Sequence, residues 1–189
     1  MRTSTRNALL VLGGVLVVGV VVVAFTRWIP KARFLRALPP EGKPYGELIW
    51  RAARRQRIAP ALLAAVIAHE SGFGLYLSPR GPRGKGDGGH GHGLSQIDDR
   101  TWGAWLATHD WGDPAVNLDK GAEILAASLR AFPGKPTAGI AAYNAGPKNV
   151  QRALEAGKPP GSVTTHDKEG RSYVENVTRR YQEIQARAA

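Results

Sequence analysis

Apolar and basic residues recur at helical spacing from residue 45 onward. Within 45–56 the apolar side chains share one face of a helix, and arginines occupy the opposite face. The apolar positions are Leu48, Ile49, Ala52 and Ala53, and the arginines are Arg51, Arg54, Arg55 and Arg57. Pro60 then suits the first turn of a second helix, and Gly72 suits its C-terminal cap. The pattern predicts two consecutive helices, over 45–56 and over 60–71.

The second of these helices carries a carboxylate on an apolar stripe. Leu63, Val66, Ile67 and Glu70 fall on one side of it at helical spacing. Because such a stripe faces the core, we expect Glu70 to lie in apolar surroundings.

The same spacing predicts further helices in the second half of the chain. They cover 117–132, 137–143, 147–156 and 171–188, and a loop covers 158–170. Before them come Trp102, Trp105 and Trp111, whose rings suit either a sugar-binding groove or a core.

Strand patterns are scarce. Residues 81–93 are rich in glycine and show no period, so we expect no regular structure there. Alternation at 94–97 is the one sign of a strand. The predicted fold is therefore mainly α-helical, with a small β-hairpin near 94–97.

An uncharged apolar stretch, 8–25, lies between basic residues near the amino terminus. Its length is about the minimum for crossing a bilayer, so we expect a transmembrane anchor, with a cleaved signal peptide as the alternative. The basic residues after it would place the carboxyl side inside, which conflicts with a function outside the cytoplasm. Residues 1–7 then form a flank, 26–44 a basic, proline-rich linker, and 45–189 the catalytic domain.

The chain is strongly basic. Its formal net charge of +11 favours anionic partners such as a cell-wall polymer, a lipid surface or nucleic acid. The charge is spread along the chain and no nucleic-acid-binding module is recognisable, so we expect no nucleic acid as a partner. The chain has no cysteine, and its fold must therefore be stable without disulfides.

Glu70, Asp87 and Asp98 together suit cleavage of a glycosidic bond. That reaction needs an acid that protonates the leaving oxygen and, in an inverting hydrolase, a carboxylate that activates water on the far side of the sugar. Burial would keep Glu70 protonated near neutral pH, and Asp98 or Asp87 would then be the base. The alternatives are an ion pair for Glu70, a helix cap for Asp98 and an Asp-Gly turn for Asp87.

Several motifs in this order carry a resemblance to a known family. They are Glu70-Ser71, Gly93-Leu94-Ser95-Gln96, Ala142-Tyr143-Asn144-Ala145-Gly146, and Thr164-Thr165-His166-Asp167 followed by Tyr173. Over about 60–184 the chain resembles the goose-type lysozymes, within the lysozyme-like group that includes soluble lytic transglycosylases. The spacing of Asp87 and Asp98 is that of the goose type. Ser95 replaces the usual Met, and 168–172 looks like an insertion, which makes Tyr143 a better match than Tyr173.

The resemblance implies a lysozyme-like α+β fold and cleavage of the β-1,4 bond between N-acetylmuramic acid and N-acetylglucosamine in peptidoglycan. Inverting hydrolysis is the expected route, and a lytic transglycosylase forming 1,6-anhydro ends is the alternative. It also implies a groove that binds glycan strands. The residues expected in that groove are Gln96, Tyr143, Asn144, Ser71, His90, His92 and Tyr173. We expect a monomer without a cofactor, anchored by its N-terminal helix with the catalytic domain in the periplasm or on the outer face, or secreted if the segment is cleaved.

Some of these residues are also compatible with a metal site, a helix cap or a non-catalytic module. His90 and His92 alternate near Asp87 as in some metal sites, but a Gly-His loop more often faces solvent or substrate, so we expect no metal. His69-Glu70 lacks the second histidine of an HExxH zinc site, because Phe73 occupies that position. Asn144 also suits a left-handed helix cap. A non-catalytic glycan-binding module is a further alternative, against which the presence of Glu70 argues.

Overall fold

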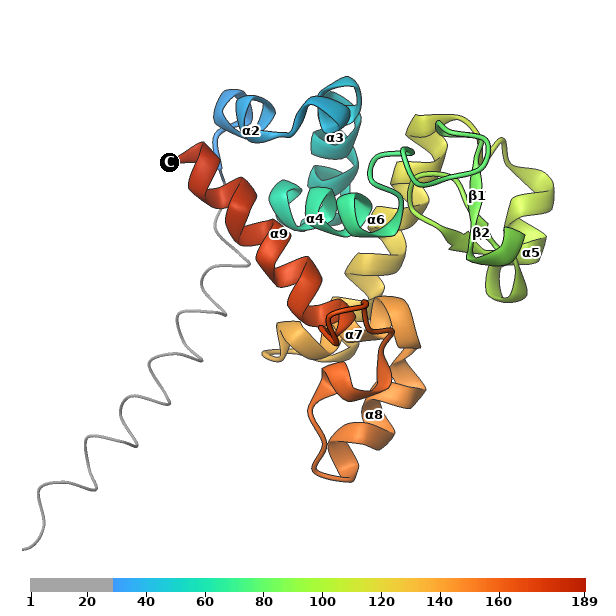
Figure 1. The fold of residues 1–189 in the computed structure, drawn as a ribbon, viewed down its shortest axis with the longest axis vertical. Helices are drawn as coiled ribbons and strands as arrows, with labels where there is room; N and C mark the ends of the chain where they lie inside the picture. The colour runs from blue at the N-terminus through green and yellow to red at the C-terminus, as the bar shows by residue number, and fades with distance from the viewer. Residues whose placement is uncertain (1–28) are drawn as a thin grey trace, which may run out of the picture.

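The structure is a computed structural model that describes residues 29–189 (Figure 1). The anchor expected at 8–25 lies outside this range. Within 29–189, none of the helices combines the length and the apolar character that a membrane crossing requires. The described chain is mainly helical and carries one small antiparallel sheet, in agreement with the predicted fold class.

Helix α4 (Pro60–Glu70) is the central element of the core. Every residue from Pro60 to Ala68 is buried, because the helix is apolar on all sides rather than along a single stripe. It packs against α9 (Tyr173–Ala188) and α3 (Gly46–Gln56), whose apolar faces cover it. Its carboxyl end is thereby held inside the molecule, and Glu70 is its last residue.

The remaining helices are α5 (Asp99–Thr108), α6 (Pro114–Ala131), α7 (Pro136–Ala145) and α8 (Pro147–Glu155), and η3 (Pro160–Val163) is a short 3-10 turn in the predicted loop. Helices α6, α7 and α8 match predicted helices closely, whereas α5 was not among them. Each of α6, α7 and α8 begins at a proline, whose missing N–H costs nothing in the first turn. In Figure 1 the sheet and α5 lie at one end, and α7 and α8 lie at the other.

The segment expected to be a linker contains ordered structure from residue 31. Helix α2 (Lys31–Ala37) and the 3-10 helix η1 (Pro40–Tyr45) precede α3. Phe34 and Leu38 are buried in the core, and the ring of Phe34 lies 5.7 Å from that of Trp50. Helix α2 also packs against α9. The folded unit therefore includes residues before 45.

The glycine-rich region holds a three-stranded antiparallel sheet, so the expectation of no regular structure at 81–93 was wrong. The strands are β1 (Lys85–Gly86), β2 (Gly91–His92) and β3 (Ile97–Asp98), and the 3-10 turn η2 (Asp87–Gly89) joins the first two. Lys85 pairs with His92, and His92 pairs with Ile97. Strands of two residues are too short to show alternation in the sequence, and this explains the error.

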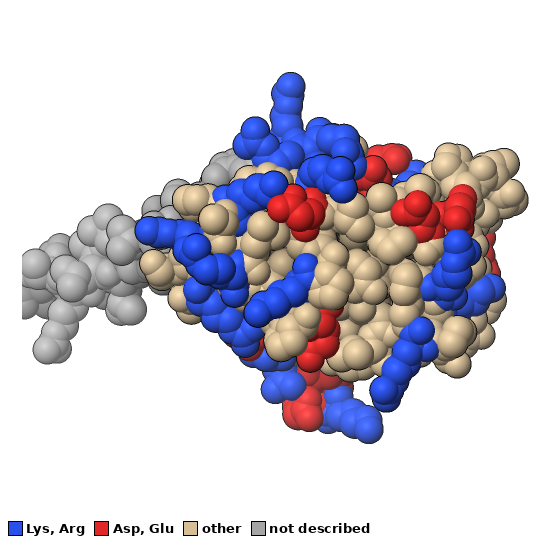
Figure 2. All heavy atoms as spheres, turned by 90° about the horizontal axis from the view of Figure 1, so that it is seen from above, with Lys and Arg blue, Asp and Glu red and all other residues tan. Residues whose placement is uncertain are grey.

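The basic charge is prominent on the face formed by α2 and α3. Figure 2, which looks onto this side, shows more blue than red side chains. The exposed cations of these two helices include Arg33, Arg36, Arg51 and Arg57, the last of which caps α3. Ion pairs neutralise part of the charge, since Lys31 pairs with Glu47 and Arg55 pairs with Asp119.

Candidate active site

The carboxyl group of Glu70 lies between helices α4 and α9. The hydroxyl of Tyr173, the first residue of α9, donates a hydrogen bond of 2.6 Å to Glu70 Oε1. Burial raises the pKa of Glu70 to about 7, and the hydrogen bond from Tyr173 partly opposes this rise. The carboxyl group is therefore poised to hold or release a proton near neutral pH.

A second tyrosine lies close to the same carboxylate. The hydroxyl of Tyr143, from α7, donates to the carbonyl oxygen of Ser95 at 2.8 Å. Burial, and then the negative charge of Glu70, raise the pKa of Tyr143 and of Tyr173 well above the usual range. Both phenols stay protonated, and Tyr173, the weaker match to the motif, is the one that contacts Glu70.

His69 precedes Glu70 and does not share its titration range. Its ring meets the ring of Tyr173 edge-on, with the centroids 4.8 Å apart. Burial, followed by the charge of Arg180, lowers the pKa of His69 to about 4. The ring is neutral at pH 7, so Glu70 is the group at this helix end that titrates there.

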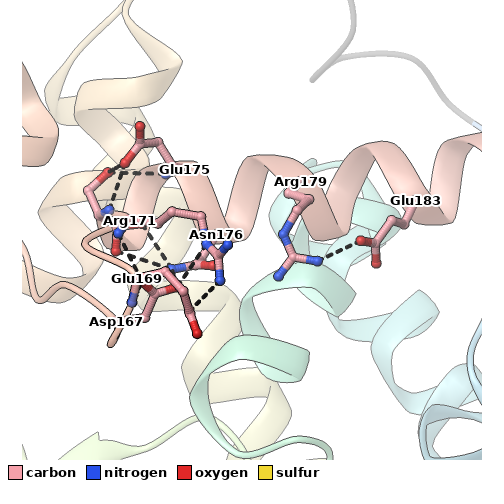
Figure 3. A network of polar contacts seen from close by, with 8 residues as sticks. Asp167, Glu169, Arg171, Glu175, Asn176, Arg179 and Glu183 are labelled. Carbon is pink, nitrogen blue, oxygen red and sulfur yellow. Dashed lines mark hydrogen bonds and ion pairs between the residues drawn. The ribbon is translucent and has the colours of Figure 1, made fainter.

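A polar network fixes the start of α9 and thus Tyr173 (Figure 3). Asp167 accepts hydrogen bonds from Arg171 Nε at 2.9 Å and from Asn176 Nδ2 at 3.0 Å. Burial acts to raise the pKa of Asp167, but these bonds outweigh it and lower the pKa to about 2. Ser172 and Glu175 complete a capping box at the N-terminus of the helix. The expected insertion therefore carries the contacts that orient Tyr173.

A cleft of about 410 Å³ lies between β3, α5, α6 and α7. Predicted site residues that line it are Gln96, Asp98, Tyr143 and Asn144. Glu70 does not line it directly, and is connected to it through Tyr143. The structure thus brings four of the expected residues to one cleft, and Glu70 and Tyr173 are not among the residues that line it.

Both candidate bases are held by one arginine. Arg100 donates from Nε to Asp98 Oδ1 at 3.0 Å and from Nη2 to Asp98 Oδ2 at 2.6 Å. The same Nη2 donates to Asp87 Oδ2 at 2.5 Å. The hydrogen bond from Arg100 lowers the pKa of Asp98, which stays ionised at neutral pH. Asp98 also caps α5, and Asp87 takes a turn conformation with φ 47°, so both structural alternatives hold as well.

Gln96 closes the turn of the sheet. Its side-chain Nε2 donates to the carbonyl oxygens of Gly93 at 2.8 Å and Gly91 at 3.3 Å. A Cβ atom on Gly86 or Gly91 would lie 2.3 or 2.2 Å from Gln96 Oε1, so a side chain at either position would have to displace the Gln96 amide. These two glycines thus leave the space that the Gln96 side chain occupies.

Asn117 of α6 is a buried positioning residue that the motifs do not reveal. Its Oδ1 accepts from the backbone N–H of Ser95 at 2.8 Å, and its Nδ2 donates to the carbonyl of His92 at 3.0 Å. An amide between two apolar residues, Val116 and Leu118, was the signal available in the sequence. Through Asn117, helix α6 holds the β2–β3 turn in place.

The two histidines of the loop share one carboxylate. His90 Nδ1 lies 2.9 Å from Asp99 Oδ1, and His92 Nε2 lies 3.2 Å from Asp99 Oδ2. Asp87, which the sequence placed near them, pairs with Arg100 instead. Among residues 29–189, no group of three or more histidine or carboxylate side chains is arranged to hold a metal ion.

Two other predicted residues have structural contacts. Ser71 is fully buried, and its hydroxyl donates to the carbonyl of Ile67 at 3.3 Å and accepts from the N–H of Gly74 at 3.2 Å. Asn144 lies inside α7 and accepts from the N–H of Thr165 at 2.9 Å. The left-handed cap expected at Asn144 is at Gly146, with φ 78°.

Comparison with known proteins agrees with this arrangement. Residues 47–161 match the family described as the transglycosylase SLT domain. The chain belongs to this family. Its SLT domain includes α4 with Glu70, the sheet, and the cleft, while α9 and Tyr173 lie beyond the matched range.

Proteins named lysozyme g are similar to the chain over a longer range. That of Struthio camelus is 32% identical over 149 residues, which are 73% of this chain and 64% of the relative. That of Dromaius novaehollandiae is 32% identical over 57% of this chain and 53% of its own length. That of Casuarius casuarius is 32% identical over 57% of this chain and 58% of its own. The chain thus spans about half to two thirds of these relatives and is related to goose-type lysozymes, as the motifs indicated.

Proposed function

We propose that this protein is a peptidoglycan-degrading glycosidase that cleaves the β-1,4 bond between N-acetylmuramic acid and N-acetylglucosamine. The observation that carries the proposal is the partly buried carboxyl group of Glu70, whose pKa is raised by desolvation to about 7, which suits a proton donor at neutral pH. Membership of the SLT family and similarity to proteins named lysozyme g support the substrate class.

In the first step, Glu70 donates its proton to the glycosidic oxygen. The bond between that oxygen and C1 breaks, both electrons go to the oxygen, and positive charge develops at C1. Tyr173 then stabilises the newly ionised Glu70 through its 2.6 Å hydrogen bond. This one hydrogen bond therefore lowers the pKa of Glu70 and stabilises its ionised form.

In the second step, a water molecule attacks C1 from the side opposite the leaving group. Asp98 is the proposed base, because it is ionised and lines the cleft. Its carboxylate takes the proton of the attacking water, and the product has an inverted anomeric centre and an intact reducing end. Asp87, 64% exposed at its side chain, is proposed to assist through Arg100.

A lytic transglycosylase is the second candidate, and one observation favours it. Arg100 occupies both oxygens of Asp98, which leaves that carboxylate less available to water. In this route the 6-hydroxyl of the muramic acid attacks C1 and forms a 1,6-anhydro ring, and its proton passes to the carboxylate of Glu70, which the first step left ionised. The two candidates share the first step and differ only in the nucleophile.

Mass analysis of muropeptides after digestion of purified peptidoglycan separates the candidates. Hydrolysis predicts products heavier by one water per cleavage, and transglycosylation predicts anhydromuramic ends. Glu70→Gln is the matched control, since it keeps the shape of the side chain and removes the proton. Undiminished cleavage by this variant would refute the assignment of Glu70, and a zymogram of the parent without a zone of clearing would indicate a non-catalytic glycan-binding module.

The remaining proposals concern location and partners. We propose that 8–25 anchors the protein in a membrane with the domain outside the cytoplasm, or that it is removed on secretion. The cations of α2 and α3 suit anionic wall polymers as additional partners. The protein is proposed to act as a monomer.

A further inference from the structure

Lys120 is an unusual buried cation in the middle of α6. Its side chain is only 6% exposed, although an ammonium group loses much of its hydration when it is buried. Such a group is tolerated only where specific partners compensate. The partners of Lys120 therefore indicate the role of this residue.

The ammonium group is surrounded by two indole rings and one carboxylate. Lys120 Nζ lies 3.7 Å from the ring centroid of Trp102 and 5.6 Å from that of Trp105. It also pairs with Glu123 Oε1 at 2.9 Å, one turn further along the helix. The shorter distance to Trp102 is well inside the range of a cation–π interaction. Lys120 thus fixes an indole from α5 and a carboxylate from α6 with one charge.

The two best partners of Lys120 both line the main cleft. Trp102 and Glu123 contribute to its wall, together with the predicted site residues Gln96 and Asp98. Trp105 and Lys120 do not line it. Trp105 instead stacks on His109, with the ring centroids 4.6 Å apart. Of the two indole rings near Lys120, that of Trp102 therefore lines the cleft and that of Trp105 does not.

We propose that Trp102 and Glu123 form a sugar-binding subsite of the cleft, in which the indole stacks on an N-acetylhexosamine ring and the carboxylate accepts a hydrogen bond from a sugar hydroxyl. Lys120 is a positioning residue, because it holds both groups and is itself covered. This inference rests on the proposed function. It adds a specific subsite formed by α5 and α6, whereas Tyr143 lies on α7.

The subsite has a chemical rationale. The faces of sugar rings carry C–H groups that pack on indole, and sugar hydroxyls are good donors to carboxylates. A cation on one side of the indole holds the ring without using hydrogen bonds that the sugar needs. The negative charge of Glu123 is half-exposed, at 52%, and can reach a ligand while one oxygen stays with Lys120.

Binding to a catalytically inert protein tests the proposal. In the full-length chain with Glu70→Gln, the affinity for a hexasaccharide of alternating N-acetylglucosamine and N-acetylmuramic acid is measured by calorimetry. Trp102→Phe is expected to weaken binding about tenfold, which corresponds to roughly 1.4 kcal/mol. Trp105→Phe is the matched control, because it removes an indole near Lys120 that does not line the cleft, and is expected to change affinity less than about twofold.

Lys120→Met separates positioning from simple support of the fold. We expect it to weaken sugar binding as Trp102→Phe does and to raise acrylamide quenching of tryptophan fluorescence, while Lys120→Arg restores both. With Glu70 intact, Trp102→Phe should raise KM and leave kcat nearly unchanged. If Lys120→Met does not fold, as judged by circular dichroism, the comparison of Trp102→Phe with Trp105→Phe still tests the proposed subsite.

The outcomes are distinct. Equal losses for Trp102→Phe and Trp105→Phe, or no loss for either, would overturn the subsite and leave the proposed function standing. A parent Glu70→Gln protein that binds no hexasaccharide would overturn both. A loss confined to Trp102→Phe and Lys120→Met supports the subsite.

Discussion

The hydroxyl of Tyr173 and the carboxylate of Glu70 are 103 residues apart in sequence and joined by a hydrogen bond of 2.6 Å. The bond joins the end of the central helix to the start of the last one. It stabilises the ionised form of Glu70, whereas burial stabilises the neutral form. The balance of these two effects sets the pH range in which Glu70 can donate a proton.

Tyr173→Phe should therefore shift the pH dependence of cleavage. The variant keeps the buried ring and removes the hydrogen bond to Glu70 Oε1, so the pKa of Glu70 should rise. We expect the descending alkaline limb of kcat/KM to move up by roughly one pH unit, on the scale of one charge-assisted hydrogen bond. Rate profiles on purified peptidoglycan between pH 4 and 9 measure this. An alkaline limb that stays in place would show that Glu70 does not govern it.

The raised pKa of Glu70 also affects stability. Its pKa is about 7 in the folded protein and about 4.5 in the unfolded chain. The contribution is fully favourable below pH 4.5 and is lost as the pH rises through 7, because the unfolded chain ionises first. Relative to Glu70→Gln, the wild type should thus lose about 3 kcal/mol of unfolding free energy between pH 4 and pH 8, as an upper estimate.

Urea unfolding of both proteins at each pH gives this difference directly. The low pKa of His69 affects both proteins in the same way and cancels. A constant difference across the range would mean that Glu70 is not in a desolvated site.

Asp98→Asn tests the proposed base without removing the helix cap, since Asn caps helices as well as Asp does. Loss of a general base should slow hydrolysis by about 10²–10⁴-fold. Asp87→Asn is the comparison, and its effect should be smaller, because Asp87 contacts the site through Arg100 alone. The measurement is the rate of reducing-end formation. Equal effects of the two variants, or anhydro products from both, would favour the transglycosylase route.

Phe34→Ala tests whether α2 belongs to the folded unit. The side chain is fully buried against the core, so its truncation should cost about 3–5 kcal/mol of unfolding free energy. Arg33→Ala, on the exposed side of the same helix, should stay within about 0.5 kcal/mol of the wild type. Chemical unfolding of the two variants gives the comparison. Similar values for both would mean that the domain begins after this helix.

The helices were predictable because their signals are local. Proline at the first turn marked the starts of α4 and α8, apolar spacing marked α6 within three residues, and the apolar run before Glu70 indicated its apolar surroundings. The pairing of Glu70 with Tyr173 was not predictable, since it depends on how α9 rotates when it packs on α4. The sequence favoured Tyr143 over Tyr173 because 168–172 looks like an insertion before Tyr173.

The loop was the least predictable part. Its strands are two residues long, and contacts from Asn117 and Gln96 hold it, which no periodicity reports. The pairing of Asp98 with Arg100 could have been predicted, because a cation two residues after an aspartate at a helix start is well placed to bind it. The family motifs identified Gln96, Tyr143 and Asn144, which line the cleft. Only the structure shows which element of the cleft each of them belongs to.

The space occupied by the Gln96 amide restricts how this protein can be altered. An alanine at Gly86 or Gly91 would have to displace that amide, and the carbonyls it satisfies would lose their partner. Attempts to rigidify the hairpin by replacing its glycines should therefore loosen the strand that leads to Asp98. Substitutions intended to change a glycan preference are better made in the helices that line the cleft, where side chains can be exchanged without disturbing the backbone around Gln96.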